Sequence, residues 1–186
     1  MRRTLTLEAA LCSALALLGA AGALAAQEGA PRGGQGTAAH PYPLGAMAPI
    51  PRSGGWQARV DSTAPDAAAV IATIPLNKPP KPGYQYFLVE LTFRYTGKGA
   101  SKIIDRLAFY AQSAGGRLYD LGLLRNACGL VPDVLDDMKK VRAGGSVSGP
   151  LCVAVRKRDA AGLLFVVEPS TIAPHSVQVF FRTRYS

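Results

Sequence analysis

The chain contains two histidines, and His175 is the candidate for a catalytic base. It is followed by Ser176, and hydrolases of the Ser–His–Asp type need a histidine within hydrogen-bond reach of the serine. Neighbouring residues of a strand point to opposite faces, however, and the sequence contains no Gly-x-Ser-x-Gly nucleophile motif. We therefore expect no enzymatic activity and no catalytic residues. The alternative is a secreted hydrolase that uses His175.

Three acidic residues, Asp133, Asp136 and Asp137, could bind a calcium ion through their carboxylate oxygens. Their spacing fits no EF-hand loop, so we expect a solvated acidic turn in which Asp133 or Asp136 caps a helical turn. His40 and Met47 are too few ligands for a copper site. The sequence therefore predicts no metal and no cofactor.

Residues 1–25 have the composition of a secretory signal peptide. Arg2 and Arg3 precede an uncharged run rich in Ala and Leu, and Ala23-Leu24-Ala25 offers small residues to a signal peptidase. The run is short for a membrane span, which needs about 20 apolar residues, and a retained anchor is the alternative. Cys12 lies before most of the run and follows a leucine, which argues against lipidation. We expect a secreted, extracellular protein with a cleaved signal peptide.

Two further cysteines, Cys128 and Cys152, follow this segment. An even number of cysteines in an exported protein is typical of a disulfide bond. We therefore expect a disulfide between them, and two free buried thiols are the alternative. A disulfide would exclude a cysteine nucleophile.

Basic side chains are the strongest sign of a partner, because the chain carries a net charge of +9. One cluster, Lys139, Lys140 and Arg142, lies on the loop between the two cysteines, and a second, Arg156-Lys157-Arg158, follows the second cysteine. A disulfide would limit how far the clusters can separate. We therefore predict that the six residues form one patch for an anionic partner.

The class of that partner follows from the compartment. Nucleic-acid binding needs stacking aromatic residues or a known module beside the charge, and neither is evident here. Outside the cell, anionic partners are wall polymers, lipid head groups and glycans. We expect an unknown protein or an anionic envelope polymer as partner, with no nucleic acid and no small-molecule cofactor. We also expect a monomer. The alternative to a partner-binding role is simply a soluble, charged surface.

Residues 26–54 are rich in Pro, Gly and Ala and show no hydrophobic periodicity. Such a segment buries too little apolar surface to offset the entropy of ordering it. The sequence therefore predicts a flexible linker over residues 26–54 and one folded domain over residues 55–186.

The clearest strand pattern runs from Tyr86 to Tyr95. Its apolar residues alternate with polar ones, which predicts a central strand with one buried face and one wet face. The positions expected to be buried are Phe87, Val89, Leu91, Phe93 and Tyr95, and the polar ones include Glu90, Thr92 and Arg94.

Short strands separated by turn residues, without a convincing long helix, predict an all-β fold. The expected strands begin near Trp56, Tyr86, Leu107, Leu118, Val147, Leu163 and Val177. About seven such strands are typical of an immunoglobulin-like antiparallel β-sandwich. We expect Trp56 to fill the core, and a ligand-stacking role is the alternative.

Four sequence blocks resemble a known family. They are Asn77-x-Pro79-Pro80-x-Pro82-Gly83-x-x-Tyr86, Tyr95-Thr96-Gly97, Cys128-Gly129-Leu130-Val131-Pro132-Asp133-x-Leu135-x-Asp137 and Gly144-Gly145-x-x-x-Gly149-x-x-Cys152-x-x-Val155. This pattern resembles the secreted, immunoglobulin-like domain of unknown function found in actinobacterial exported proteins, a relative of the immunoprotective extracellular protein group. The resemblance covers residues 56–185 and implies an immunoglobulin-like sandwich and export, without an agreed activity. The basic run Arg156-Lys157-Arg158 departs from the family pattern.

Overall fold

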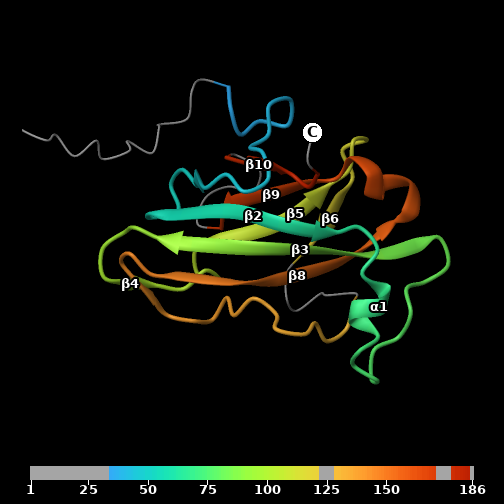
Figure 1. The fold of residues 1–186 in the computed structure, drawn as a ribbon. Helices are drawn as coiled ribbons and strands as arrows, with labels where there is room; N and C mark the ends of the chain where they lie inside the picture. The colour runs from blue at the N-terminus through green and yellow to red at the C-terminus, as the bar shows by residue number, and fades with distance from the viewer. Residues whose placement is uncertain (1–33, 122–127, 171–176, 185–186) are drawn as a thin grey trace, which may run out of the picture. The chain divides into compact units, whose positions relative to one another are not determined.

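The computed structural model describes residues 34–121, 128–170 and 177–184, which form two antiparallel sheets packed face to face (Figure 1). Across the first sheet the order is β1 (Ala48–Pro49), β2 (Trp56–Ala64), β3 (Tyr84–Tyr95) and β8 (Ser146–Arg156). Across the second it is β10 (Val179–Arg182), β9 (Leu164–Pro169), β5 (Leu107–Gln112) and β6 (Leu118–Asp120).

Smaller elements complete the described part of the chain. A separate pair of short strands is formed by β4 (Ala100–Ser101) and β7 (Val141–Arg142). The described helices are α1 (Ala68–Ile71) and the 3₁₀ helix η2 (Lys157–Gly162). Neither of these two helices is long and apolar enough to cross a membrane.

The prediction of an all-β, immunoglobulin-like β-sandwich is confirmed. The expected strands correspond to β2, β3, β5, β6, β8, β9 and β10, each beginning within about two residues of the predicted start. The first sheet contains β2, β3 and β8, and the second contains β10, β9 and β5, which is the division of strands found in immunoglobulin-like sandwiches. The prediction did not include β1, β4 and β7, which have two residues each.

The buried face of β3 has the predicted register. Its expected core residues, from Phe87 to Tyr95 at every second position, are all buried in the main core between the sheets. The ring of Phe93 packs against that of Phe109 on β5, with ring centroids 5.2 Å apart, and so joins the two sheets. Trp56 is also buried in this core, and its indole nitrogen donates a hydrogen bond to the Ser101 hydroxyl. The core-filling role of Trp56 is therefore confirmed.

The opposite face of β3 is only partly exposed to solvent, whereas the prediction was a fully exposed face. Arg94 is exposed, but Tyr86 and Leu88 at the other end of the strand are buried in a second, smaller core. This core lies under α1 and the disulfide, and its other members are Ala67, Ile71, Cys128, Val131 and Cys152. The alternation in the sequence could not show this cover, because it is supplied by segments far away in the chain.

The N-terminal boundary of the domain needs correction. Within the predicted linker, Tyr42, Ala48 and Ile50 are buried in the main core, and β1 pairs with β2. The backbone of Tyr42 also pairs with β10: Tyr42 N donates to Phe180 O, and Arg182 N donates to Tyr42 O, both at 2.8 Å. Isolated apolar residues between turns can therefore pack on the sandwich without any periodicity. The remainder of the predicted linker, residues 26–33, and the predicted signal peptide lie outside the described residues.

Candidate anion-binding site at the Arg156 end

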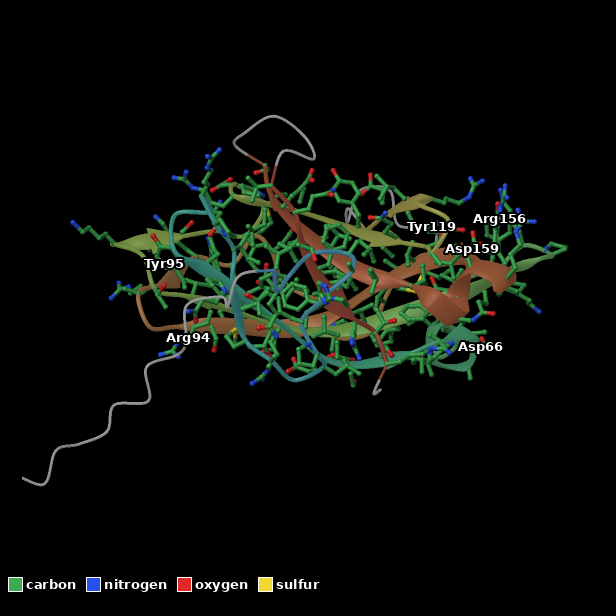
Figure 2. All side chains as sticks on the ribbon, turned by 90° about the horizontal axis from the view of Figure 1, so that it is seen from above. Asp66, Arg94, Tyr95, Tyr119, Arg156 and Asp159 are labelled. Carbon is green, nitrogen blue, oxygen red and sulfur yellow. A yellow bond between two sulfur atoms is a disulfide. The ribbon has the colours of Figure 1, made fainter. Side chains whose placement is uncertain are left out.

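The two predicted basic clusters lie at opposite ends of the first sheet. In the register of β3 and β8, Arg156 is opposite Tyr84 and Ser146 is opposite Arg94. Ten residues of β8 therefore separate the two ends, about 33 Å at the usual rise per residue. Figure 2 shows Arg156 at one end and Arg94 and Tyr95 at the other.

The cluster of Lys139, Lys140 and Arg142 belongs to the Tyr95 end. Arg142 pairs with Ala100, and the turn that follows bonds to Tyr95, whose nitrogen donates to Gly145 O. The predicted single patch is therefore wrong. The disulfide holds only the start of the loop, and the rest of the loop runs along the edge of β8, where Leu135 N donates to Pro150 O at 3.0 Å.

A different basic cluster forms at the other end, around Tyr84. We call it the basic end and define it as Lys78, Lys81, Arg117, Arg156, Lys157 and Arg158. Arg156 lies directly across from Tyr84 on the neighbouring strand. The hydrogen bond from the Arg156 guanidinium, together with its positive charge, lowers the pKa of the Tyr84 hydroxyl, and Arg117 and Lys81 lower this pKa further. The Tyr84 hydroxyl is thus affected by cations from three segments of the chain.

Turns at the ends of β3 and β8 hold these cations in place. Gly83 has a φ of 80°, a left-handed conformation that favours glycine, and its carbonyl accepts a hydrogen bond from Lys157 N at 3.0 Å. This bond joins the start of η2 to the start of β3. On the other side, the Tyr86 hydroxyl donates to Lys78 O at 2.8 Å and fixes the proline-rich loop that carries Lys78 and Lys81.

Two shallow hollows meet at Tyr84. One, of about 470 Å³, is lined by Gly83, Tyr84 and Arg156–Arg158. The other, of about 400 Å³, is lined by Lys78, Pro79, Lys81, Tyr84, Tyr86 and Ala154. Because Tyr84 borders both, the cations from the proline-rich loop and from η2 face one continuous surface.

The carboxylates at this end only partly offset its charge. Asp159 lies 3.8 Å from Arg117 Nε and 3.9 Å from Arg158 Nε, and it accepts a hydrogen bond from the Tyr119 hydroxyl. Figure 2 shows Asp66 at the same end, toward α1. Six cations against these two carboxylates leave a positive surface, which favours an anion with several charges.

The remaining predicted site residues have different outcomes. Cys128 and Cys152 form the expected disulfide, with their Cα atoms 6.1 Å apart.

The three acidic residues that were candidates for a calcium site do not form a solvated turn. Asp137 is buried, and this burial, followed by the nearby charge of Asp136, raises the pKa of the Asp137 carboxyl. Asp133 is exposed, has a φ of 50°, and borders another hollow beside Glu90. Among the described residues, no group of three or more His, Cys, Asp or Glu side chains could hold a metal ion. The hydrolase candidate His175 lies outside the described residues.

Sequence reasoning missed Lys78, Lys81, Tyr84 and Arg117. Arg117 lies on the turn between β5 and β6, and the others lie on or just after the proline-rich loop. Each is an ordinary surface residue in its own segment. The signal that could have found Tyr84 is its position at the start of the central strand, because the neighbouring strand must end beside it.

Comparison with a solved structure supports this architecture. The fold is that of a secreted mycobacterial protein. The structure of MPT63 from Mycobacterium tuberculosis superposes with a TM-score of 0.52 at 17% sequence identity, over 77% of this chain and 98% of that one. An uncharacterised β-sandwich protein from Clostridium difficile aligns over 77% of this chain and 95% of its own, with 8% identity and a TM-score of 0.45. No family model and no curated protein matches the sequence, so the family resemblance stays a prediction.

Proposed function

We propose that this protein is an exported, non-enzymatic β-sandwich domain that binds an anionic component of the cell envelope through its basic end. The observation that carries the proposal is the convergence of five cations on the two hollows that meet at Tyr84, with Arg117 close enough to lower the pKa of the Tyr84 hydroxyl. Only the folded chain brings them together, because they span residues 78–158.

The chemistry of the basic end suits binding. Arg156 lies on the ordered end of β8 directly across from Tyr84, so the backbone that carries its guanidinium is already positioned before an anion arrives. A guanidinium can donate two parallel hydrogen bonds to a phosphate or carboxylate, while the lysines add flexible charge around it. Cations and phenols provide recognition here, whereas hydrolysis would need a nucleophile paired with a base.

Two features support export. Residues 1–25 have the three regions of a secretory signal peptide. The disulfide between Cys128 and Cys152 is a kind of bond that persists in oxidising compartments. At such a location the abundant polyanions are envelope polymers and lipid head groups.

Elution of the full chain from phosphocellulose with increasing salt tests the proposal. The structure provides a matched control, because the two basic clusters carry three charges each at opposite ends of β8. Reversing the charges of Arg156, Lys157 and Arg158 to Glu should move elution to much lower salt. Reversing those of Lys139, Lys140 and Arg142 in the same way makes an equal change in net charge and should have a clearly smaller effect.

Equal elution of the two variants would show that net charge alone determines retention, and the proposal would then fail. Circular dichroism of both variants checks that the sandwich still folds. The substituted residues other than Arg156 are exposed, so their replacement should not disturb the core.

A further inference from the structure

Two large apolar side chains beside the basic end are held in an exposed position. Leu76, on the loop after α1, is 83% exposed, and Leu130, on the disulfide loop, is 56% exposed. The side chain of Asn77 joins the two loops: Leu130 N donates to Asn77 Oδ1 at 2.7 Å, and Asn77 Nδ2 donates to Leu130 O at 2.6 Å. The two leucines are therefore presented by one hydrogen-bonded junction.

This junction is fixed on both sides. Asn77 Nδ2 also donates to Ile71 O at 2.8 Å, which ties the junction to α1. Leu130 follows Cys128 by two residues, and the disulfide ties that loop to β8. Gly129, between them, has a φ of 79°, and a Cβ atom there would collide with the side chain of Asn77. Single exposed leucines are common, but two on a braced junction form a defined apolar tip.

The apolar tip lies next to the basic end along the chain. Lys78 follows Leu76 by two residues and lines the hollow that Lys81 and Tyr84 share. Tyr84 then connects this hollow to Arg156 and the start of η2. Apolar side chains beside cations and a tyrosine are the combination found where proteins lie on a membrane interface, with the apolar groups in the acyl boundary and the cations among lipid phosphates.

We infer that the anionic component is the surface of a phospholipid bilayer, into which Leu76 and Leu130 insert while the basic end contacts the lipid phosphates. This inference rests on the proposed function and adds the identity of the partner. A dissolved polyanion would use the cations alone, whereas a bilayer uses both the cations and the leucines. The observations therefore favour the lipid surface over a soluble polymer.

Sedimentation of the full chain with vesicles tests the inference. Vesicles of equal parts phosphatidylglycerol and phosphatidylcholine should bind the protein, and vesicles of phosphatidylcholine alone should bind it far more weakly. Replacing both Leu76 and Leu130 by Ser should lower the partition coefficient on the anionic vesicles about tenfold or more, because buried leucine side chains contribute strongly to interfacial binding.

A second exposed apolar pair is the matched control. Ile104 is 41% exposed and Met138 is 54% exposed, and their segments are joined by a hydrogen bond from Ile104 N to Asp137 O. Replacing this pair by Ser should leave vesicle binding unchanged. An equal loss in both double variants would overturn the inference, because the effect would then come from surface hydrophobicity in general.

The outcome separates the inference from the proposed function. If the Leu76 and Leu130 double variant binds anionic vesicles as the wild type does, while reversal of Arg156–Arg158 abolishes binding, the membrane inference fails and anion binding stands. The same conclusion follows if the protein is retained on phosphocellulose but does not bind the vesicles. If Arg156–Arg158 reversal leaves both kinds of binding unchanged, the proposed function itself fails.

Insertion can also be observed directly. Trp56 is the chain's one tryptophan and is buried in the core, so its emission should not respond to vesicles. A Leu76→Trp variant should show a blue shift of emission on anionic vesicles as its new indole leaves water. An unchanged emission maximum in a variant that still sediments with the vesicles would overturn the insertion of this loop.

Discussion

The ring of Tyr42 packs on the ring of Phe181, with centroids 5.6 Å apart and planes inclined by 33°. Phe181 lies on β10, the edge strand of the second sheet, and Phe180 N beside it donates to Gly36 O at 2.9 Å. The segment before β1 therefore covers an edge that would otherwise expose unpaired backbone groups. It forms part of the folded domain.

Removing residues up to 54 should destabilise the domain. The deletion takes away buried Tyr42, Ala48 and Ile50 together with the backbone bonds to β10. Tyr42→Ala alone should lower the free energy of unfolding by about 3 kcal/mol or more, since it leaves a cavity beside Phe181. Denaturant titration measures both. A truncated chain as stable as the full one would mean that this segment is only a tether, as its composition suggests.

Replacing Cys128 or Cys152 by Ser should lower the free energy of unfolding by about 2–5 kcal/mol, as expected for a native disulfide in a small secreted domain. The bond also fixes the second core, because both cysteines pack there with Tyr86 and Leu88. In the wild-type protein, the thiols should resist alkylation until a reductant is added. Alkylation of the native, unreduced protein at either cysteine would contradict the pairing.

The two faces of β3 should respond differently to truncation. Phe93→Ala should lower the free energy of unfolding by about 3–5 kcal/mol, because the ring is fully buried and joins the sheets. Thr92→Ala removes hydrogen bonds to Asp61 and Ser148, each at 2.8 Å, and should cost about 1 kcal/mol. Equal costs in urea titrations would mean that the assigned register is wrong.

Much of the fold was predictable because local patterns agree with the tertiary arrangement. The alternation in β3 and the turn residues around it located the strand to within two residues. The second core and the cover on β10 were not predictable in the same way. Tyr86 is buried by α1 and the disulfide loop, and Tyr42 by β10, and both arrangements depend on contacts between distant segments.

The candidate site was harder to predict than the fold. Charge alone indicated an anionic partner, and the disulfide suggested that two clusters would meet. The strand register separates Arg142 from Arg156 and brings Lys81 and Arg117 to Tyr84 instead. A disulfide limits the distance at the ends of a loop, but the direction of the loop is set by the edge of β8 along which it packs.

Glu90 should make stability depend on pH. Burial, followed by the charges of Asp61 and Asp133, raises its pKa, so the folded state binds this proton more tightly than the unfolded state does. The stabilisation from the protonated carboxyl is complete below the unfolded pKa of about 4.3 and is lost as the pH rises through the folded pKa. Glu90→Gln should therefore stabilise the protein near neutral pH.

The gain in Glu90→Gln should disappear at and below about pH 4, where the wild-type carboxyl is itself protonated. Asp105→Asn, which removes an exposed carboxylate from a turn, is the control and should leave unfolding nearly unchanged. Thermal unfolding over a series of pH values measures the difference. A Glu90→Gln variant that is less stable than the wild type at neutral pH would contradict the assigned cause of the shift.

Tyr84 should report on the charge of the basic end. The hydrogen bond and the charge of Arg156 lower its pKa, so Arg156→Gln should raise this pKa toward the ordinary value of about 10. The folded state favours the ionised phenol. Any resulting increase in the free energy of unfolding therefore begins as the pH rises through the lowered folded pKa and is complete above the unfolded pKa. NMR of ring-labelled tyrosine can follow this titration, and Tyr84→Phe assigns the signal among the seven tyrosines.

The same titration links the side chain to binding. An anion held by Arg156 and Lys81 would offset their charge, so saturating inorganic phosphate should raise the pKa of Tyr84. Reversing Lys139, Lys140 and Arg142 to Glu should leave this response in place, because those residues lie at the other end of β8. If phosphate has no effect while Arg156→Gln raises the pKa, the guanidinium is paired with Tyr84 as a structural contact and phosphate does not occupy the basic end.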